Sequence, residues 1–576
     1  MNYAPGAHPN IALELPGWRA TVLFVILLAG LAGLLGRGVY LQGIRDDFLQ
    51  EKGNARYSRV IEVSAHRGMI TDRNGLPLAI STPVESVWAS PQNAEADNRQ
   101  VKKLAQILGM NVEEVKNRLF DTSRDFIYLK RQLPPDQVEK VVSLNLPGIS
   151  LQREYRRYYP AGEETAQLLG FTGQGDNGQE GVELALQERL GGKPGSQRVI
   201  RDRRGHIVED AGSLHAPKPG GDIALSLDSN VQHLAYRELE NAIRSHKAKA
   251  GAVVVLDARS GEVLALANYP SYNPNNRGKV SSQAMRNRAI ADLFEPGSTM
   301  KPFTVATAIE HGKVRPETVL DTEHGVMTVG NKKIHDSHPE SMLTVSQIIQ
   351  KSSNVGAAKI ALSLESQTLW QSLSDSGFGA HTGSNFPGEA PGKLRDPKTW
   401  RPIEQATMSY GHGISVNLLQ LARAYTVFAN RGELKPVSLL KLDAPSVGRK
   451  VFSDSTARAL SDMLELVVLP GGTAPLAQVA GYRVAGKTGT AHKLENGHYI
   501  NRYVASFVGF APASNPRLVV AVMIDEPSNG QYYGGLVAAP VFSKVTGAAL
   551  HALNVPNDAP LDNVIAPPED IVKEEV

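Results

Sequence analysis

A run of 17 uncharged residues near the N-terminus is the strongest single constraint on this chain. It reads from Ala20 to Gly36 and is bounded by Arg19 and Arg37. At 1.5 Å per residue, a helix of this length is at the short end of what crosses a bilayer. Residues 39–41 extend it if Arg37 reaches toward the membrane interface. We therefore predict a membrane anchor over residues 20–41.

A cleavable signal peptide is the alternative interpretation of the same run. Such a peptide ends in a small-residue cleavage site of the A-x-A kind. Ala29, Gly30 and Ala32 are small, but no clean A-x-A sequence follows the apolar stretch. The pattern favours an uncleaved anchor. The charges around it do not fix its orientation, because long domains cross a membrane largely regardless of flanking charge.

The rest of the chain is long enough for several folded domains. The protein has 576 residues, which corresponds to roughly three to four domains. Its 61 basic and 58 acidic residues give a net charge of +3, which is no reason to expect a nucleic-acid partner. Cysteine is absent, which excludes disulfides, thiolate metal sites and a cysteine nucleophile. We expect neither a metal nor a cofactor.

Turn signals and composition divide the chain after the anchor. We predict a polar stalk over residues 42–58 and a mixed α/β domain over 59–217 that shows no catalytic constellation. This domain contains an Asn-Gly turn at residues 74–75 and one helix over 102–119. A breaker cluster at residues 218–221 begins a second domain, 218–555. The tail, residues 556–576, is rich in proline and acidic residues and is predicted to be disordered.

Strand patterns open and close the second domain. Two apolar runs, 252–257 and 263–268, are split by a Ser-Gly turn, and two more runs occupy 503–510 and 517–525. A helical pattern over 229–245 and further helical patterns lie between them. This order predicts an α+β fold whose sheet joins both ends of the domain.

The strongest chemical signal begins at Ser298. The apolar positions that follow have helical spacing and end at Gly312, so Ser298 and Lys301 are predicted on one face of a helix N-terminus. A serine hydroxyl becomes nucleophilic when a neighbouring base takes its proton. A lysine is such a base only when neutral, and burial or a second cation lowers its pKa. Pro302 is anomalous here because it lacks an N–H.

The same S-x-x-K spacing recurs at Ser438 and Lys441, which provides an internal comparison. That copy lies in the run VSLLKL, which resembles a strand. Residues three apart on a strand point to opposite faces. The S-x-x-K spacing therefore predicts a nucleophile and its base only at Ser298 and Lys301, where the surrounding pattern is helical.

Two further motifs follow in order. Ser352 and Asn354 form an S-x-N motif 54 residues after Ser298, at the end of an apolar helical pattern. Their hydroxyl and amide are suited to relaying a proton and holding a substrate carbonyl. Lys487 opens a single K-T-G motif and would supply the second cation, while Gly489 allows close approach of a substrate backbone.

A phosphate-binding loop is the alternative interpretation of the last motif. The spacing G-x-x-x-x-G-K-[ST] matches from Gly481 to Thr488. Such a loop should follow a strand and open an apolar helix. Residues 489–501 are polar and interrupted by glycine, so the context disfavours nucleotide binding.

The ordered triple resembles the serine enzymes that react with penicillin, and the chain is identified as a member of the class B penicillin-binding proteins. Its length and compact pedestal most resemble the division-specific, septal member. The resemblance implies a penicillin-binding, serine β-lactamase-like transpeptidase domain with an antiparallel sheet flanked by helices. It also implies a cytoplasmic segment 1–19, a single pass through the bacterial inner membrane and a periplasmic catalytic domain. Further matching segments are residues 67–75, 157–162, 181–183, 221–223, 228–232, 410–413 and 430–432.

The implied activity is a peptidoglycan D,D-transpeptidase that works through a serine acyl-enzyme. By this resemblance Ser298 attacks the penultimate D-Ala carbonyl of a stem pentapeptide and Lys301 is the base. Ser352 and Lys487 pass a proton to the leaving amine, and Asn354 holds the amide of the donor. The implied substrate-binding residues are Thr488, Gly489, Thr490, Tyr532 and Tyr533, of which the two tyrosines form either an apolar wall or only a surface hairpin.

The resemblance also implies partners and leaves alternatives open. Expected ligands are peptidoglycan stem peptides and β-lactams. A polytopic membrane glycosyltransferase and other division proteins are expected because residues 59–210 show no second catalytic constellation. A D,D-carboxypeptidase or a weak β-lactamase would use the same fold, although no E-x-x-L-N stretch supplies a deacylating carboxylate. A non-catalytic membrane penicillin sensor or division scaffold is the alternative from another class.

Overall fold

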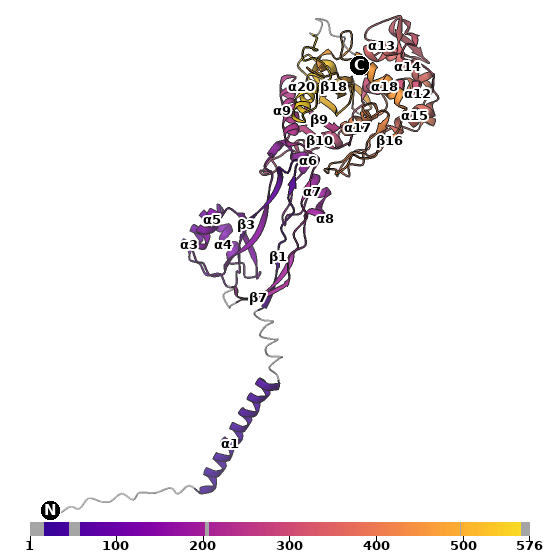
Figure 1. Ribbon diagram of the computed structural model, residues 1–576. Helices are drawn as coiled ribbons and strands as arrows, with labels where there is room; N and C mark the ends of the chain where they lie inside the picture. Colours follow the sequence, from indigo (N-terminus) through magenta and orange to yellow (C-terminus); the bar gives the residue numbers. More distant parts are fainter. Residues whose placement is uncertain (1–15, 45–57, 202–206, 496, 566–576) are drawn as a thin grey trace, which may run out of the picture. The chain divides into compact units, whose positions relative to one another are not determined.

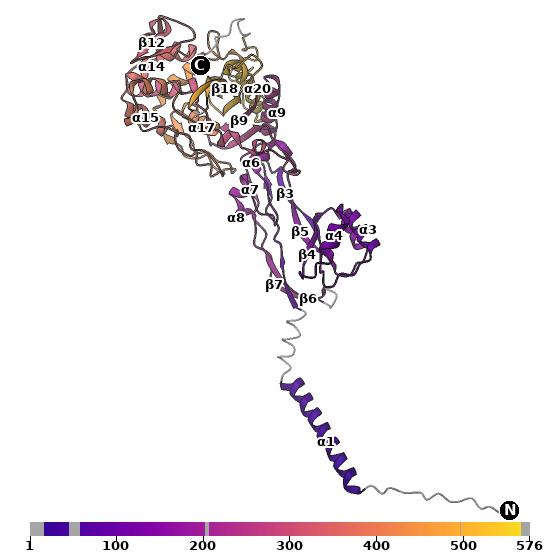
Figure 2. The ribbon, with the colours of Figure 1, turned by 180° about the vertical axis from the view of Figure 1, so that it is seen from behind.

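The computed structural model describes residues 16–44, 58–201, 207–495 and 497–565, and the chain divides into two compact units. The first unit comprises the described residues of Met1–Ser64, Glu85–Arg153 and Pro194–Pro217. The second comprises those of Ala65–Val84, Glu154–Lys193 and Lys218–Val576. Figures 1 and 2 show the elements of each unit from opposite sides.

The predicted anchor is a single long helix. α1 spans Gly17–Val39 and continues as a π-helical turn over Tyr40–Ile44. The stretch Gly17–Gly43 has a mean hydropathy of 2.2, and none of its apolar window is buried in protein. A helix of this length and composition is able to cross a membrane. Residues 45–57, most of the predicted stalk, lie outside the described residues.

The first unit contains a three-stranded antiparallel sheet of order β1-β6-β7 and a separate helical layer. In that layer β4 pairs with the second half of β3, and the helices bury their apolar faces in one core. The elements are β1 (Ser58–Val63), β3 (Pro77–Ala89), α3 (Asn98–Leu108), α4 (Val112–Leu119), β4 (Ile127–Leu133), α5 (Pro135–Val142), β5 (Ile149–Tyr158), β6 (Gly195–Arg201) and β7 (Ile207–His215), with β3 and β5 contributing to both units.

The single helix predicted over residues 102–119 is wrong, because the structure has two helices there. Gly109 ends α3 in a left-handed conformation, with φ 61°. The Asn111 side chain accepts the Glu113 N–H and caps α4. Both helices bury apolar residues in the same core, so the hydrophobic period continues across the break and hides it from a pattern analysis.

The second unit is built on a five-stranded antiparallel sheet. Its order is β10-β9-β19-β18-β17, and the strands are β9 (Ala250–Asp257), β10 (Val263–Tyr269), β17 (Ala485–Glu495), β18 (His498–Ala511) and β19 (Leu518–Asp525). Strands from the beginning of the domain therefore pair with strands from its end, as predicted. The predicted helix is also confirmed, since α9 spans Ser229–Ser245.

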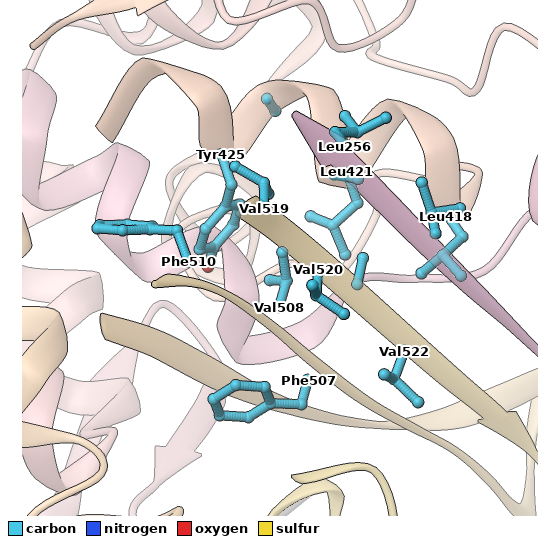
Figure 3. Close-up of a cluster of buried hydrophobic side chains, with 14 of the residues drawn as sticks. Leu256, Leu418, Leu421, Tyr425, Phe507, Val508, Phe510, Val519, Val520 and Val522 are labelled. Atoms are coloured by element: carbon cyan, nitrogen blue, oxygen red, sulfur yellow. The ribbon is translucent and has the colours of Figure 1, made fainter. Parts of the chain in front are cut away.

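Helices cover both faces of this sheet. On one face Phe507 of β18 contacts Phe542 of α20 (Ala539–Ala552), with ring centroids 4.6 Å apart. On the other face lies α17 (Leu418–Ala429), and Figure 3 shows Tyr425, Leu421 and Leu418 beside side chains of β9 and β19. Full burial of a side chain of this size contributes about 1.5–3 kcal/mol, so the sheet is a rigid base for the residues at its edge.

Among the remaining helices, α12–α15 gather on the side of the unit away from α9 and α20 (Figures 1 and 2). The short strands form two-stranded sheets, β11 with β14, β12 with β13 and β15 with β16. β2 instead joins a larger sheet, since it pairs with the first half of β3 on one side and with β8 on the other. Their bounds are β2 (Ile70–Thr71), α6 (Ala166–Leu169), α7 (Gly181–Ala185), α8 (Gln187–Leu190), β8 (Ile223–Ala224), α10 (Ser282–Met285), α11 (Arg288–Ala291), α12 (Lys301–Glu310), β11 (Val319–Asp321), β12 (Val326–Val329), β13 (Lys332–His335), β14 (Met342–Thr344), α13 (Val345–Lys351), α14 (Asn354–Leu362), α15 (Ser366–Asp375), α16 (Pro402–Met408), β15 (Glu433–Leu434), β16 (Arg449–Lys450), α18 (Asp454–Leu466) and α19 (Gly534–Val537).

Two other expectations differ from the structure. The run VSLLKL is not a regular strand: Ser438 and Leu440 each form only an isolated bridge. Disorder was expected from residue 556 onward, but part of that tail is held in place. Asp558 accepts the N–H of Arg483 at 2.7 Å, and Asn563 accepts the N–H of Gly481 at 3.0 Å. Residues 566–576 lie outside the described residues.

Candidate active site

Ser298 and Lys301 are brought together by a change of helix type. Residues Gly297–Met300 form a 3₁₀ turn, and the α-helix α12 begins at Lys301. Pro302 therefore lies in the first turn of α12, where its missing N–H has no cost, which explains the anomaly. Lys301 is fully buried, and its Nζ lies 3.0 Å from Ser298 Oγ.

The side chain of Lys301 also reaches Ser352. Lys301 Nζ donates to Ser352 Oγ at 2.9 Å and to the Ser352 carbonyl oxygen. Ser352 is the C-cap of α13 and has a left-handed φ of 62°, a conformation that is uncommon for a residue with a side chain. This conformation ends the helix and places both oxygens of Ser352 on the lysine.

Asn354 is held by a neighbouring carboxylate. Asp336, just after β13, accepts the N–H of Asn354 at 2.5 Å and the hydroxyl of Ser353 at 2.6 Å. Asn354 is the first residue of α14, where a negative charge is favourable. Its side-chain amide donates to the carbonyl of His335 at 3.0 Å. The S-x-N motif is thus fixed at a helix–helix junction.

The K-T-G motif lies on β17, at the edge of the main sheet. Lys487 is fully buried, and its Nζ donates to Thr488 Oγ1 at 3.0 Å. Thr490 Oγ1 accepts the N–H of Gly534 at 3.0 Å. Because Lys487 stands inside a strand rather than at the start of a helix, the geometry excludes the phosphate-loop alternative.

Gly489 is required where β17 meets the turn that carries Ser298. A Cβ at this position would come within 2.5 Å of Ser506 Oγ and 2.7 Å of the Pro296 carbonyl oxygen. The glycine therefore lets β17 approach the turn that carries Ser298. The close approach is between two segments of the protein itself.

These segments enclose a cavity of about 200 Å³. Three predicted residues line it: Ser298, Asn354 and Thr490. The other lining residues were not singled out as site residues from the sequence: Gly297, Lys333, Ile334, His335, Tyr410 and His412. Tyr410 and His412 belong to the YGHG segment that carries part of the family resemblance, which was the available signal for them.

Burial favours the neutral forms of the basic groups at and near this cavity. His412 is half-buried, and burial, the nearby Lys301 and His492 together lower its pKa to about 4. It is therefore neutral near pH 7. Lys301 and Lys487 are both fully buried, and burial disfavours the charged form of an amine.

Tyr532 and Tyr533 do not line this cavity. Their hydroxyls are 3.0 Å apart, and the ring of Tyr532 stacks on that of Tyr503 with centroids 4.0 Å apart. Gly534, which follows them, is the residue bonded to Thr490. The two tyrosines are thus part of an aromatic stack beside the K-T-G strand, since Tyr503 lies on β18, the strand that pairs with β17.

The second S-x-x-K copy has a different environment. Ser438 Oγ donates to the carbonyl oxygen of Leu440 at 2.7 Å. It engages its own backbone, whereas Ser298 engages a buried amine. Among the described residues, no group of three or more His, Asp or Glu side chains is arranged to hold a metal ion.

Two family models match the chain. The first, described as the penicillin binding protein transpeptidase domain, matches residues 251–547. The second, described as the penicillin-binding protein dimerisation domain, matches residues 62–225.

Relatives and solved structures agree with these matches. The chain is 44% identical over 94% of its length to the probable peptidoglycan D,D-transpeptidase PenA of Neisseria meningitidis, covering 94% of that protein. It is 44% identical to the peptidoglycan D,D-transpeptidase FtsI of Escherichia coli over 94% of this chain and 93% of the relative. The apo transpeptidase domain of Burkholderia pseudomallei penicillin-binding protein 3 is 48% identical, with a TM-score of 0.55, and covers 58% of this chain and 98% of that one.

Proposed function

The chain belongs to the class B penicillin-binding proteins, and from this premise we propose that it is a peptidoglycan D,D-transpeptidase of the division septum with Ser298 as its nucleophile. One observation carries the assignment: the buried Nζ of Lys301 lies 3.0 Å from Ser298 Oγ and 2.9 Å from Ser352 Oγ. An alcohol next to a buried amine is the arrangement that activates a serine.

This geometry supports the acylation half-reaction that the family resemblance implies. Ser298 Oγ attacks the penultimate D-Ala carbonyl of a stem pentapeptide as its proton moves to Lys301. The C–N bond to the terminal D-Ala then breaks, and Ser352 and Lys487 return a proton to the departing amine. A proton transfer by a positioned side chain contributes about 10²–10⁴ in rate.

The cavity supplies the other requirements of acyl transfer. The backbone N–H groups of Ser298 and Thr490 stabilise the oxyanion, each with about 3–4 kcal/mol. Thr488 and Thr490 bind the substrate carboxylate, or that of a β-lactam, beside Gly489, and Asn354 holds the donor amide. Tyr532 and Tyr533 are proposed to form an apolar wall of the substrate site, as the resemblance implies.

The anchor and the proposed chemistry together support a location. α1 is long and apolar enough to cross a membrane, and peptidoglycan cross-linking takes place outside the cytoplasm. We therefore assign α1 to the bacterial inner membrane and the catalytic domain to the periplasm. Glycan strands are supplied by a polytopic membrane glycosyltransferase, in the company of other division proteins.

Labelling with a fluorescent penicillin tests the nucleophile. Ser298→Ala is expected to abolish covalent labelling, whereas Ser438→Ala, which changes the second S-x-x-K copy, leaves it intact. Labelling that persists in Ser298→Ala disproves the assignment. Mass analysis of the labelled peptide then locates the ester.

Cross-linking itself separates the enzyme from its alternatives. Lipid-linked substrate together with a polymerase partner should give dimeric stem peptides. Release of D-Ala without dimers would identify a D,D-carboxypeptidase, and rapid turnover of penicillin a β-lactamase. Labelling without any product would identify a sensor or scaffold.

A further inference from the structure

A second cavity, of about 420 Å³, lies beside the catalytic one. Three chain segments pass from the lining of one cavity to the lining of the other: residues 293–298, 410–415 and 490–494. Ser298 and Thr490 line the first cavity, while Glu295 and Ala491 line the second. The second cavity therefore opens next to the nucleophile, and its volume is within the range of small-molecule sites.

The second cavity combines apolar walls with charges of both signs. Its apolar residues include Leu293, Phe294, Ile414 and Val504. Two of its cations already have ionic partners, since Arg395 contacts Glu404 and Lys493 contacts Asp525. Lys393 has no ionic partner within the described part of the chain, and it is exposed.

Glu295 is the carboxylate of this cavity, three residues before Ser298. It is half-buried. Its Oε1 accepts the N–H of Gly413 at 2.8 Å, and its Oε2 accepts the Tyr499 hydroxyl at 3.0 Å. A carboxylate has about four acceptor positions, so these two bonds fix its orientation and leave room for another donor. Burial raises the pKa of Glu295, which makes the carboxylate a stronger proton acceptor.

We propose that this second cavity is the acceptor site, in which Glu295 receives the attacking ammonium and Lys393 a carboxylate carried close to it. The inference rests on the proposed transpeptidase function, because that reaction needs a second substrate beside the acyl-enzyme. The paired charges select an amino-acid head group rather than a simple amine, and the apolar wall accommodates its methylene chain.

The deacylation step balances with these groups. The acceptor ammonium gives one proton to Glu295, and the resulting amine attacks the ester carbonyl of acylated Ser298. A C–N bond forms and the C–Oγ bond breaks. A second amine proton returns to Ser298 Oγ by way of Lys301, and Glu295 releases its proton to water.

The proposal is tested by measuring how the acyl-enzyme divides between attack by an amine and attack by water. The full-length protein is acylated with an N-acyl-D-alanyl thioester, and thiol release reports acylation. D-Alanine or D-alaninamide is added as the acceptor, and mass spectrometry gives the ratio of amide to acid product. Glu295→Gln keeps the hydrogen bond from Gly413 through Oε1, while its Nε2 would donate to the Tyr499 hydroxyl oxygen instead of accepting from it. We expect the variant to lower the amide-to-acid ratio about 100-fold, far more than it lowers thiol release.

The role of Lys393 is tested by substitution, which should leave the fold intact because this side chain is exposed. Lys393→Ala should raise the half-saturating D-alanine concentration about fivefold, with no change for D-alaninamide, which lacks the carboxylate. Lys398→Ala, an exposed lysine outside the cavity lining, is the matched control and should behave as wild type.

The outcomes distinguish this inference from the function on which it rests. An unchanged product ratio in both variants overturns the acceptor site, as does a loss of thiol release equal to the loss of amide. A wild-type protein that yields only acid with every amine overturns the transpeptidase function itself.

Discussion

Gly411 lies directly against the backbone of Gly297, the residue before the nucleophile. A Cβ on Gly411 would come within 2.2 Å of the Gly297 carbonyl oxygen, and Gly411 has a φ of +90°. The position of Ser298 therefore depends on a glycine more than a hundred residues away in the sequence.

Gly411→Ala is expected to slow acylation by penicillin about 100-fold, the loss typical of a reacting group displaced by about 1 Å. Gly413→Ala is the matched comparison. Its φ of +79° is similar, but its nearest neighbour is the flexible end of Arg395 at 3.5 Å, so only the backbone strain of about 1–2 kcal/mol remains. Second-order acylation rates measure the difference, and equal losses in the two variants would refute the argument.

Substitution of two adjacent serines, Ser352 and Ser353, should separate an effect on catalysis from an effect on stability. Ser352→Ala removes the hydroxyl that Lys301 contacts at 2.9 Å, so we expect acylation to fall about 10²–10⁴-fold with little change in melting temperature. Ser353→Ala removes the N-cap of α14, whose hydroxyl also bonds Asp336, and should cost about 1 kcal/mol of stability. Acylation rates and thermal melts on both variants check the contrast, and a reversal of the two effects would contradict it.

The sequence predicted the central residues of the site because each motif is short and the motifs occur in a recognisable order. Ser298 and Lys301 are three residues apart, so a helical turn alone joins them, and the order of the motifs then pointed to Ser352 and Lys487. The walls of the cavity could not be predicted in this way. His412 reaches the site only through the fold, since its segment lies against the turn that carries Ser298.

Secondary structure was predicted best where burial is regular. The two hairpin strands are continuous buried apolar runs, and α9 follows a helical hydrophobic period. The helix break at Gly109 was not predicted because the apolar stripe continues across it. The run at Ser438 was expected to be a strand, but in the structure it forms only isolated bridges.

The neutral state of His412 should make stability depend on pH. Burial, Lys301 and His492 lower its pKa to about 4, compared with about 6.5 in an unfolded chain. Between these values the unfolded chain binds a proton that the folded protein does not. The full contribution is therefore present above about pH 6.5, and up to about 3 kcal/mol is lost as the pH falls toward 4.

His412→Asn removes this contribution and should flatten the pH dependence of unfolding. Urea midpoints at pH 7 and pH 5, for wild type and variant, give the comparison. Other groups titrate alike in both proteins and cancel. Parallel curves for the two proteins would show that His412 is protonated in the folded state.

The buried charge cluster of the second unit gives the largest stability effect. Glu183 bonds Arg67 Nη2 and Arg157 Nε, each at 2.6 Å, and all three side chains are at most 1% exposed. Removing one member of such a cluster leaves uncompensated buried charge, which costs about 3–5 kcal/mol. Glu183→Ala should therefore lower the urea midpoint strongly. Glu183→Gln should also lower it, because the amide carries no charge and its single oxygen accepts from only one of the two arginines, while its NH2 group faces the other. Glu188→Ala, at an exposed position in the next helix, α8, should change stability by less than about 0.5 kcal/mol. Equal midpoints for Glu183→Ala and Glu188→Ala would mean that the two arginines find other partners, and that the cluster does not hold this part of the chain together.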